Sequence, residues 1–214
     1  MRKLLVTRFH LLLLGLLAAI TATAFVKVPE ATGLPVHWGL DGKPDQIWPR
    51  DQALWVFPSI AIVLIAISLL IGRLASGEQL DAGRPVLETV IAGLLALCCA
   101  LQFAFLLIGI GSDIDMLRLL AFALAALFVA LGAALPRARP NVYAGIRLPW
   151  TMKSPQTWRA THRLTGVLMA AAGLSLAVVA LLWPAPATLL VAIGLAVFLP
   201  TLVGAIFSFV VSRR

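Results

Sequence analysis

The sequence predicts an all-α fold, a polytopic membrane bundle of six transmembrane helices with cytoplasmic N- and C-termini. Of its 214 residues, 61% are apolar and 12% charged, and the mean hydropathy is +1.01, whereas soluble domains carry about a quarter charged residues. Six apolar runs are long enough to cross a bilayer core of about 30 Å as helices. No run alternates apolar and polar residues as a membrane barrel does. Helices are the remaining way to satisfy the backbone in lipid.

The six spans follow one another along the whole chain: Phe9–Val28, Ala53–Gly72, Val86–Ile110, Leu117–Leu135, Leu164–Trp183 and Ala187–Val211. Four of the 17 lysines and arginines, Lys27, Lys43, Arg50 and Arg118, fall in the odd-numbered loops or at their edges. The others lie in the tails and the even-numbered loops, which the positive-inside rule places in the cytoplasm. We divide the chain into residues 1–72, with an outer loop at 29–52, residues 73–135, and residues 136–214.

The first span has an alternative interpretation as a cleaved signal peptide. A basic start, the apolar run Leu11–Ile20 and the small residues Ala22-Thr23-Ala24 fit that pattern. The apolar run continues through Phe25 and Val26, which favours a retained span. Cleavage would leave the other five spans oriented as before.

The charge and the cysteines exclude several classes of function. The net charge of +8 is explained by topology, so we predict no direct nucleic-acid binding. Cys98 and Cys99 are neighbours in an apolar run, which indicates packing rather than a metal site or a disulfide. The chain has no H-E-x-x-H or G-x-S-x-G motif, and His37 and His162 are predicted on opposite sides of the membrane. The sequence therefore predicts no enzyme activity, no catalytic residue, no cofactor and no bound metal.

The outer loop, Pro29–Gln52, is longer than a connection requires and is rich in turn-forming glycine and proline. We expect a compact cap on the membrane surface, with extended backbone around Leu34–Trp38. His37, Asp41 and Asp45 are residue types that bind divalent cations. A turn at Asp41 and an ion pair from Asp45 to Lys43 or Arg50 explain these residues more simply.

The inner segment, Pro136–Arg163, predicts extended backbone between Pro140 and Pro149. Ser154 and Pro155 form a helix start from which the helix continues into the fifth span. In this helix, the spacing of about 3.6 residues per turn puts a face of mixed aromatic and polar residues beside a face of arginines. The arginines and tryptophans of this segment either anchor the helix at lipid headgroups or form a docking surface for a cytoplasmic partner.

The spans themselves hold few polar residues. Gln102 is the one strongly polar side chain well inside a span, and an interhelical hydrogen bond explains it as well as a transport pathway does. Glu88 is predicted within about a turn of the third span's start, and Pro200 is expected to kink the last helix. A small transporter or channel is the alternative function, and it rests on Gln102 and Pro200 alone.

Two strings of residues resemble known families. The outer string Leu34–Asp45, with Pro35, His37 and Trp38, resembles a small bacterial domain of unknown function. The inner string resembles the SdpI family of integral membrane proteins at about ten positions: Asn141, Gly145, Ile146, Arg147, Pro149, Trp150, Thr151, Ser154, Trp158, Thr161 and His162.

The resemblance implies a multi-pass protein of the bacterial cytoplasmic membrane, related to immunity proteins that protect a producer cell from its own secreted toxin. It also implies a signalling role, in which toxin binding sequesters a cytoplasmic transcriptional repressor. The expected partners are the lipid bilayer, an extracellular peptide toxin and that repressor. The candidate ligand site in the outer loop is His37, Trp38, Asp41 and Asp45. The candidate partner site is Asn141, Gly145, Arg147, Pro149, Trp150, Trp158 and His162.

Overall fold

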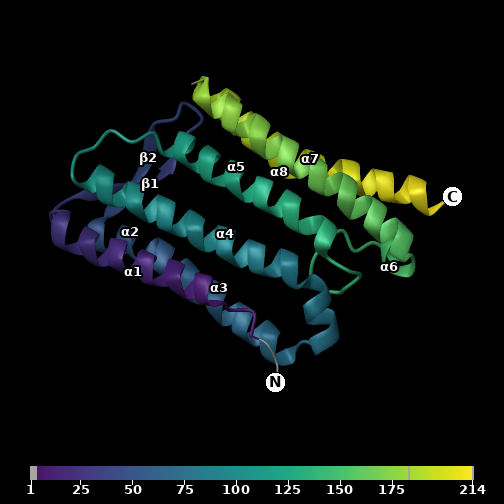
Figure 1. The fold of residues 1–214 in the computed structure, drawn as a ribbon. Coiled ribbons are helices and arrows are strands. Elements are labelled where there is room, and N and C mark those ends of the chain that lie inside the picture. Colours follow the sequence, from purple (N-terminus) through teal and green to yellow (C-terminus); the bar gives the residue numbers. More distant parts are fainter. Residues whose placement is uncertain (1–3, 183, 214) are drawn as a thin grey trace.

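The computed structural model describes residues 4–182 and 184–213, through which six long helices run back and forth (Figure 1). Each helix overlaps one predicted span and is long and apolar enough to cross a membrane, which confirms the all-α bundle of six spans. Their bounds are α1 Arg8–Lys27, α3 Val56–Leu74, α4 Gly77–Gly109, α5 Met116–Ala134, α7 Pro155–Leu181 and α8 Pro186–Ser212. Shorter helices lie in the connections: α2 Arg50–Leu54, η1 Leu135–Arg137 and α6 Pro149–Lys153.

The helices pack as a row rather than a ring. Helix α7 packs between α5 and α8, while α4 packs between α5 and the pair formed by α1 and α3 (Figure 1). The contact of α5 with α7 is close because glycines face each other. A Cβ atom added to Gly132 would lie 2.5 Å from the carbonyl oxygen of Gly166. Small residues thus let the two backbones touch, as is common between helices in membranes.

Helix α4 begins at Gly77, nine residues before the apolar run that predicted it. Its first turns are charged, so hydropathy alone placed the start too late. Glu88 consequently lies three turns into the helix, where its Oε1 accepts from Arg84 at 3.1 Å, and the prediction that it lies within about a turn of the start is wrong. Pro85 lies inside α4, and the helix bends near this end (Figure 1).

His10 links the start of α1 to α4 through hydrogen bonds. Its Nδ1 accepts a hydrogen bond from the backbone N–H of Thr7 at 2.9 Å, so the proton resides on Nε2, which donates to the carbonyl of Glu88 at 3.1 Å. The side chain is 1% exposed. The imidazole therefore satisfies polar groups on two helices at once, which stabilises their contact.

The outer loop folds into a β-hairpin of β1 Gly33–Trp38 and β2 Pro44–Pro49, which are antiparallel. The extended backbone expected around Leu34–Trp38 is confirmed, and a second strand joins it. Leu34 is fully buried beneath the hairpin, whereas every residue of β2 is exposed. The hairpin therefore lies as a cap over the end of the bundle.

Arg50 fixes the base of this hairpin. Its guanidinium donates to the carbonyl of Val28 at 2.8 Å and to Asp51 at 2.8 Å, and it lies over the ring of Phe25. Arg50 is 7% exposed. Asp45 pairs with His37 instead, so the expected ion pair of Asp45 with Lys43 or Arg50 is wrong.

The bundle has two distinct ends. We call the end that carries β1, β2 and residues 110–115 the hairpin end. The opposite end, where α1 and α7 begin and α8 finishes, carries the motif segment, residues 138–153, and we call it the motif end (Figure 1).

Candidate functional site

Trp158 forms the centre of the motif end. Its side chain is fully buried, and its Nε1–H donates to the carbonyl of Ala138 at 2.9 Å. The ring of His162 stacks on the indole with centroids 3.9 Å apart and planes at 20°. These two residues, one turn apart on α7, hold the beginning of the motif segment against that helix. Ser154 caps α7 by accepting from the N–H of Thr157, as the sequence predicted.

His162 holds the middle of the same segment. Its Nε2 accepts a hydrogen bond from the backbone N–H of Ile146 at 3.0 Å. The proton must then reside on Nδ1, which donates to the carbonyl of Trp158 at 2.8 Å. Both ring nitrogens of a neutral imidazole are thereby satisfied in a site that is 1% exposed. His162 is a structural acceptor for the loop.

Gly145 makes this contact possible. Its φ is +107°, a left-handed conformation that side chains disfavour, and an added Cβ would lie 2.2 Å from Nε2 of His162. The glycine therefore lets the backbone turn directly against the imidazole.

Asn141 organises the turn that precedes Gly145. Its buried Oδ1 accepts from the N–H groups of Tyr143 and Ala144 at 2.9 and 2.8 Å, and its Nδ2 donates to the carbonyl of Arg139 at 2.8 Å. The amide packs on Gly83 of α4, where a Cβ atom would lie 2.7 Å from Oδ1. A single side chain thus closes the turn and seats it on a neighbouring helix.

The end of the motif segment is tied to the last helix through α6. Thr151 Oγ1 donates to the carbonyl of Ile146 at 2.7 Å and accepts from the N–H of Leu148 at 2.9 Å. The indole N–H of Trp150 donates to Ser208 of α8 at 2.8 Å. Helix α6 was not predicted, although Pro149 at its first position is the signal that could have found it. Residues 141–148 are not helical, but the extended backbone predicted between Pro140 and Pro149 is wrong at residues 142–145, which form bends, with Gly145 at a φ of +107°.

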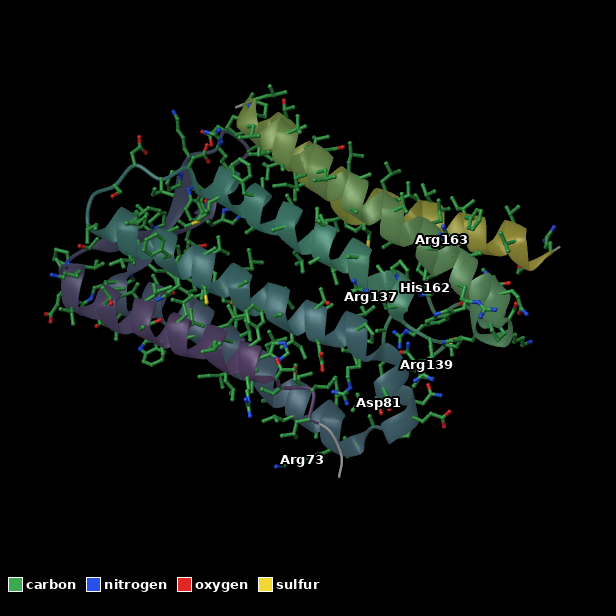
Figure 2. The ribbon with its side chains drawn as sticks, viewed as in Figure 1. Arg73, Asp81, Arg137, Arg139, His162 and Arg163 are labelled. Carbon is green, nitrogen blue, oxygen red and sulfur yellow. The ribbon has the colours of Figure 1, made fainter. Side chains whose placement is uncertain are left out.

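The seven candidate partner-binding residues therefore meet in one unit but differ in exposure. Asn141, Trp158 and His162 are buried and shape the segment from within, and Trp150 is half-buried. Gly145, Arg147 and Pro149 reach the surface. The surrounding exposed cations are Arg137, Arg139, Lys153, Arg159 and Arg163, several of which are labelled in Figure 2. What this unit presents outward is therefore a basic surface.

The candidate ligand residues lie at the hairpin end. His37 Nδ1 and Asp45 Oδ1 are 2.6 Å apart across the two strands, and their side chains are 64% and 51% exposed. Asp41 accepts from the N–H of Lys43 at 3.0 Å and so closes the turn between the strands. His37 and Asp45 form a surface pair, while Asp41 has a turn-forming contact.

Trp38 lies between two cavities. One, of about 660 Å³, is bounded by the hairpin, the α4–α5 connection and the start of α8, and it includes Asp113 and Asp115. The other, of about 340 Å³, lies between the hairpin and helices α3, α4 and α5. Sequence reasoning missed both aspartates. Asp115 carries a recognisable signal, because it caps α5 by accepting from the N–H of Arg118.

Gln102 lies inside the bundle and is fully buried. Its Nε2 donates to the carbonyl of Leu54 at 3.1 Å, which is the interhelical hydrogen bond considered from the sequence. This bond fixes α4 to the helix below the hairpin. It gives Gln102 a structural explanation that needs no transport pathway.

Comparisons with known proteins agree with the motif. Residues 137–212 match the model of the SdpI/YfhL protein family. The chain is also similar to the Immunity protein SdpI of Bacillus subtilis (strain 168), with 22% identity over 145 residues that cover 68% of each protein. No solved structure matches the chain. The matched region contains all seven candidate partner-binding residues, so it is this part of the multi-pass membrane protein that is similar to the SdpI/YfhL protein family.

Proposed function

We propose that this protein gives its bacterial host immunity to a secreted, membrane-active peptide, acting without catalysis in the cytoplasmic membrane. The observation that carries the proposal is the similarity to an immunity protein over 68% of the chain. The architecture supports it, because the hairpin end offers a folded surface with cavities and the motif end offers a separate basic surface.

Charge supports one orientation of the protein in the membrane. The cations of the motif end outnumber its three carboxylates, Glu78, Asp81 and Glu88, whereas the hairpin end has more carboxylates than cations. By the positive-inside rule the motif end faces the cytoplasm and the hairpin faces outward. The hairpin is then the part that an extracellular peptide meets first.

The hairpin end has the chemistry to bind such a peptide. Asp113 and Asp115 attract a cationic segment, and Trp38 offers an aromatic face between two cavities. Arg118, near the outer end of α5, donates to the carbonyl of Ala180 at the outer end of α7, at 2.8 Å. This bond joins the two helices at the hairpin end, so ligand binding there is transmitted along α7. The same helix carries Trp158 and His162 at its inner end.

The basic surface of the motif end suits an acidic patch on a cytoplasmic repressor. A ligand that favours one packing of α5 against α7 would change how the motif segment is displayed. Signalling through such a repressor is the second part of the proposal, and protection does not depend on it.

Two tryptophans of the hairpin provide the test. The full-length protein is expressed in a sensitive bacterium, and survival is measured against a panel of membrane-active peptides. We expect wild-type protein to protect against at least one of them, Trp38→Ala to abolish that protection, and Trp48→Ala to retain it. Trp48 is the matched control, because it lies on the same hairpin but lines neither cavity. Equal killing with and without the wild-type protein across the panel would overturn the proposal.

A further inference from the structure

A long groove of about 900 Å³ runs along the outside of the bundle from the motif end. It is bounded by the start of α1, one face of α4 and the last turns of α5, which lie side by side in Figure 1. Along α4 it extends from Asp81 to Ala100, about 28 Å at 1.5 Å per residue. This length spans most of a bilayer core of about 30 Å, so the groove accommodates an acyl chain.

Small side chains create the apolar part of the groove. Ala96 and Ala126 face each other's helices from α4 and α5 and are both exposed. The remaining small residues of the walls are Ala92, Gly93, Ala100, Ala123 and Ala130. These small side chains leave an open apolar channel between the two helices.

Charged side chains occupy the motif end of the groove. Arg84 is shared between two carboxylates, Asp81 at 2.9 Å and Glu88 at 3.1 Å. This cluster has one more negative than positive charge. Arg137 lines the same groove from η1, which follows α5, and is labelled in Figure 2. Its side chain has no hydrogen bond or ion pair with any residue in the described part of the chain.

We propose that this groove is a binding site for a phospholipid with a primary-amine headgroup, of the phosphatidylethanolamine type. The guanidinium of Arg137 binds the phosphate, and the carboxylates of Asp81 and Glu88 accept from the ammonium group. One acyl chain lies along the alanines of α4 and α5. The site adds a function that does not depend on the proposed immunity role.

The arrangement of charge selects this headgroup over others. A phosphatidylcholine headgroup has the same charges, but its ammonium carries no N–H to donate to the carboxylates. A phosphatidylglycerol headgroup has no cation, so its approach to Asp81 and Glu88 is unfavourable. Only a headgroup with an ammonium donor and a phosphate complements both sides of the groove.

Lipid retention measures this preference. Full-length protein is reconstituted in vesicles containing equal amounts of phosphatidylethanolamine, phosphatidylcholine and phosphatidylglycerol with identical acyl chains, extracted in mild detergent, and examined by native mass spectrometry. We expect wild-type protein to retain phosphatidylethanolamine about tenfold over phosphatidylcholine, since donated hydrogen bonds to charged groups distinguish the two. Equal retention of the three lipids would overturn the proposal.

Two variants with matched controls locate the site. Arg137→Gln is expected to reduce retention of phosphatidylethanolamine about tenfold, while Arg163→Gln, an exposed arginine on α7, leaves it unchanged. Ala126→Phe fills the groove and is expected to displace the bound lipid, while Ala171→Phe on the exposed face of α7 does not. Thermal unfolding is followed for all four variants. Unchanged retention in both groove variants, or an equal loss in their controls, would contradict the assignment.

Discussion

The two ends of the molecule use their recognisable residues in opposite ways. At the motif end, Asn141, Trp158 and His162 are buried, and their polar atoms bind the backbone of the motif segment. At the hairpin end, His37 and Asp45 pair on the surface with more than half of each side chain exposed. The first set specifies a loop conformation, and the second set is available to a ligand.

The contrast indicates which substitutions change the stability of the protein and which change its binding of a ligand. A buried polar atom whose partner is removed retains its full desolvation cost, whereas an exposed pair exchanges its bond for water. Substitutions at the motif end should therefore unfold the segment, and substitutions at the hairpin end should change binding while the fold survives.

We expect the strongest contrast between the two ends in their accessibility from the two sides of the membrane. A cysteine introduced as Lys43→Cys should react with an impermeant thiol reagent in intact cells, whereas Lys153→Cys should react only after permeabilisation. Both lysines are exposed, and wild-type protein is the control because Cys98 and Cys99 are buried. Labelling of both positions from the same side would invalidate the assignment of an outer and an inner end.

Gly145→Ala should cause the next largest change. The new Cβ would meet the imidazole of His162 and would impose a side chain on a left-handed backbone. Together these effects should destabilise the protein by about 2–5 kcal/mol, measured as thermal unfolding in detergent. The control is Gly194→Ala, where an added Cβ has no atom within 4 Å. Equal unfolding temperatures for the two variants would show that the His162 contact is not tight.

Asn141→Ala should have a somewhat smaller effect. It leaves the buried N–H of Ala144 and the part-buried N–H of Tyr143 without their acceptor, and the loss should be about 1–3 kcal/mol in total, because water can reach Tyr143. Hydrogen exchange at these two amides should accelerate along with the loss of stability. Gln79→Ala is the comparison, because it removes one exposed hydrogen bond to the same loop. An Asn141 variant no less stable than the Gln79 variant would argue against the buried network.

Asp45→Asn should have the smallest effect on stability, below about 1 kcal/mol, because the pair with His37 is solvent-exposed. Peptide protection should nevertheless decrease if the hairpin binds the ligand. Glu30→Gln, at a 92% exposed carboxylate nearby, is the control for protection. A loss of stability as large as that of Asn141→Ala would remove the contrast between the two ends.

The sequence was most informative where one physical effect dominates. Six apolar runs predicted six helices, because a backbone in lipid has few alternatives. The cap of α7 at Ser154 was also identified correctly, and the interhelical bond of Gln102 was one of the two explanations that the sequence left open. The start of α4 at Gly77 was not, because its first turns are held by tertiary contacts of Gln79 and Ala82 with the motif segment rather than by hydropathy.

The candidate sites were harder to predict because their partners are far apart in the chain. The spacing of the motif identified Asn141, Gly145, Trp158 and His162 as candidates. It does not reveal that the side chain of Asn141 packs against Gly83 of α4. The partner of Asp45 was assigned by proximity in sequence to Lys43 or Arg50. Strand pairing instead places His37 opposite it.

From the sequence alone came the six helices that are long and apolar enough to cross a membrane, since length and hydropathy act locally. The tertiary structure decided the roles of the individual residues. The tautomers of His10 and His162, the burial of Arg50 and the groove beside Arg137 all depend on groups contributed by distant helices. A side chain's protonation, burial and partners are set by what packs around it, and that is a property of the folded bundle.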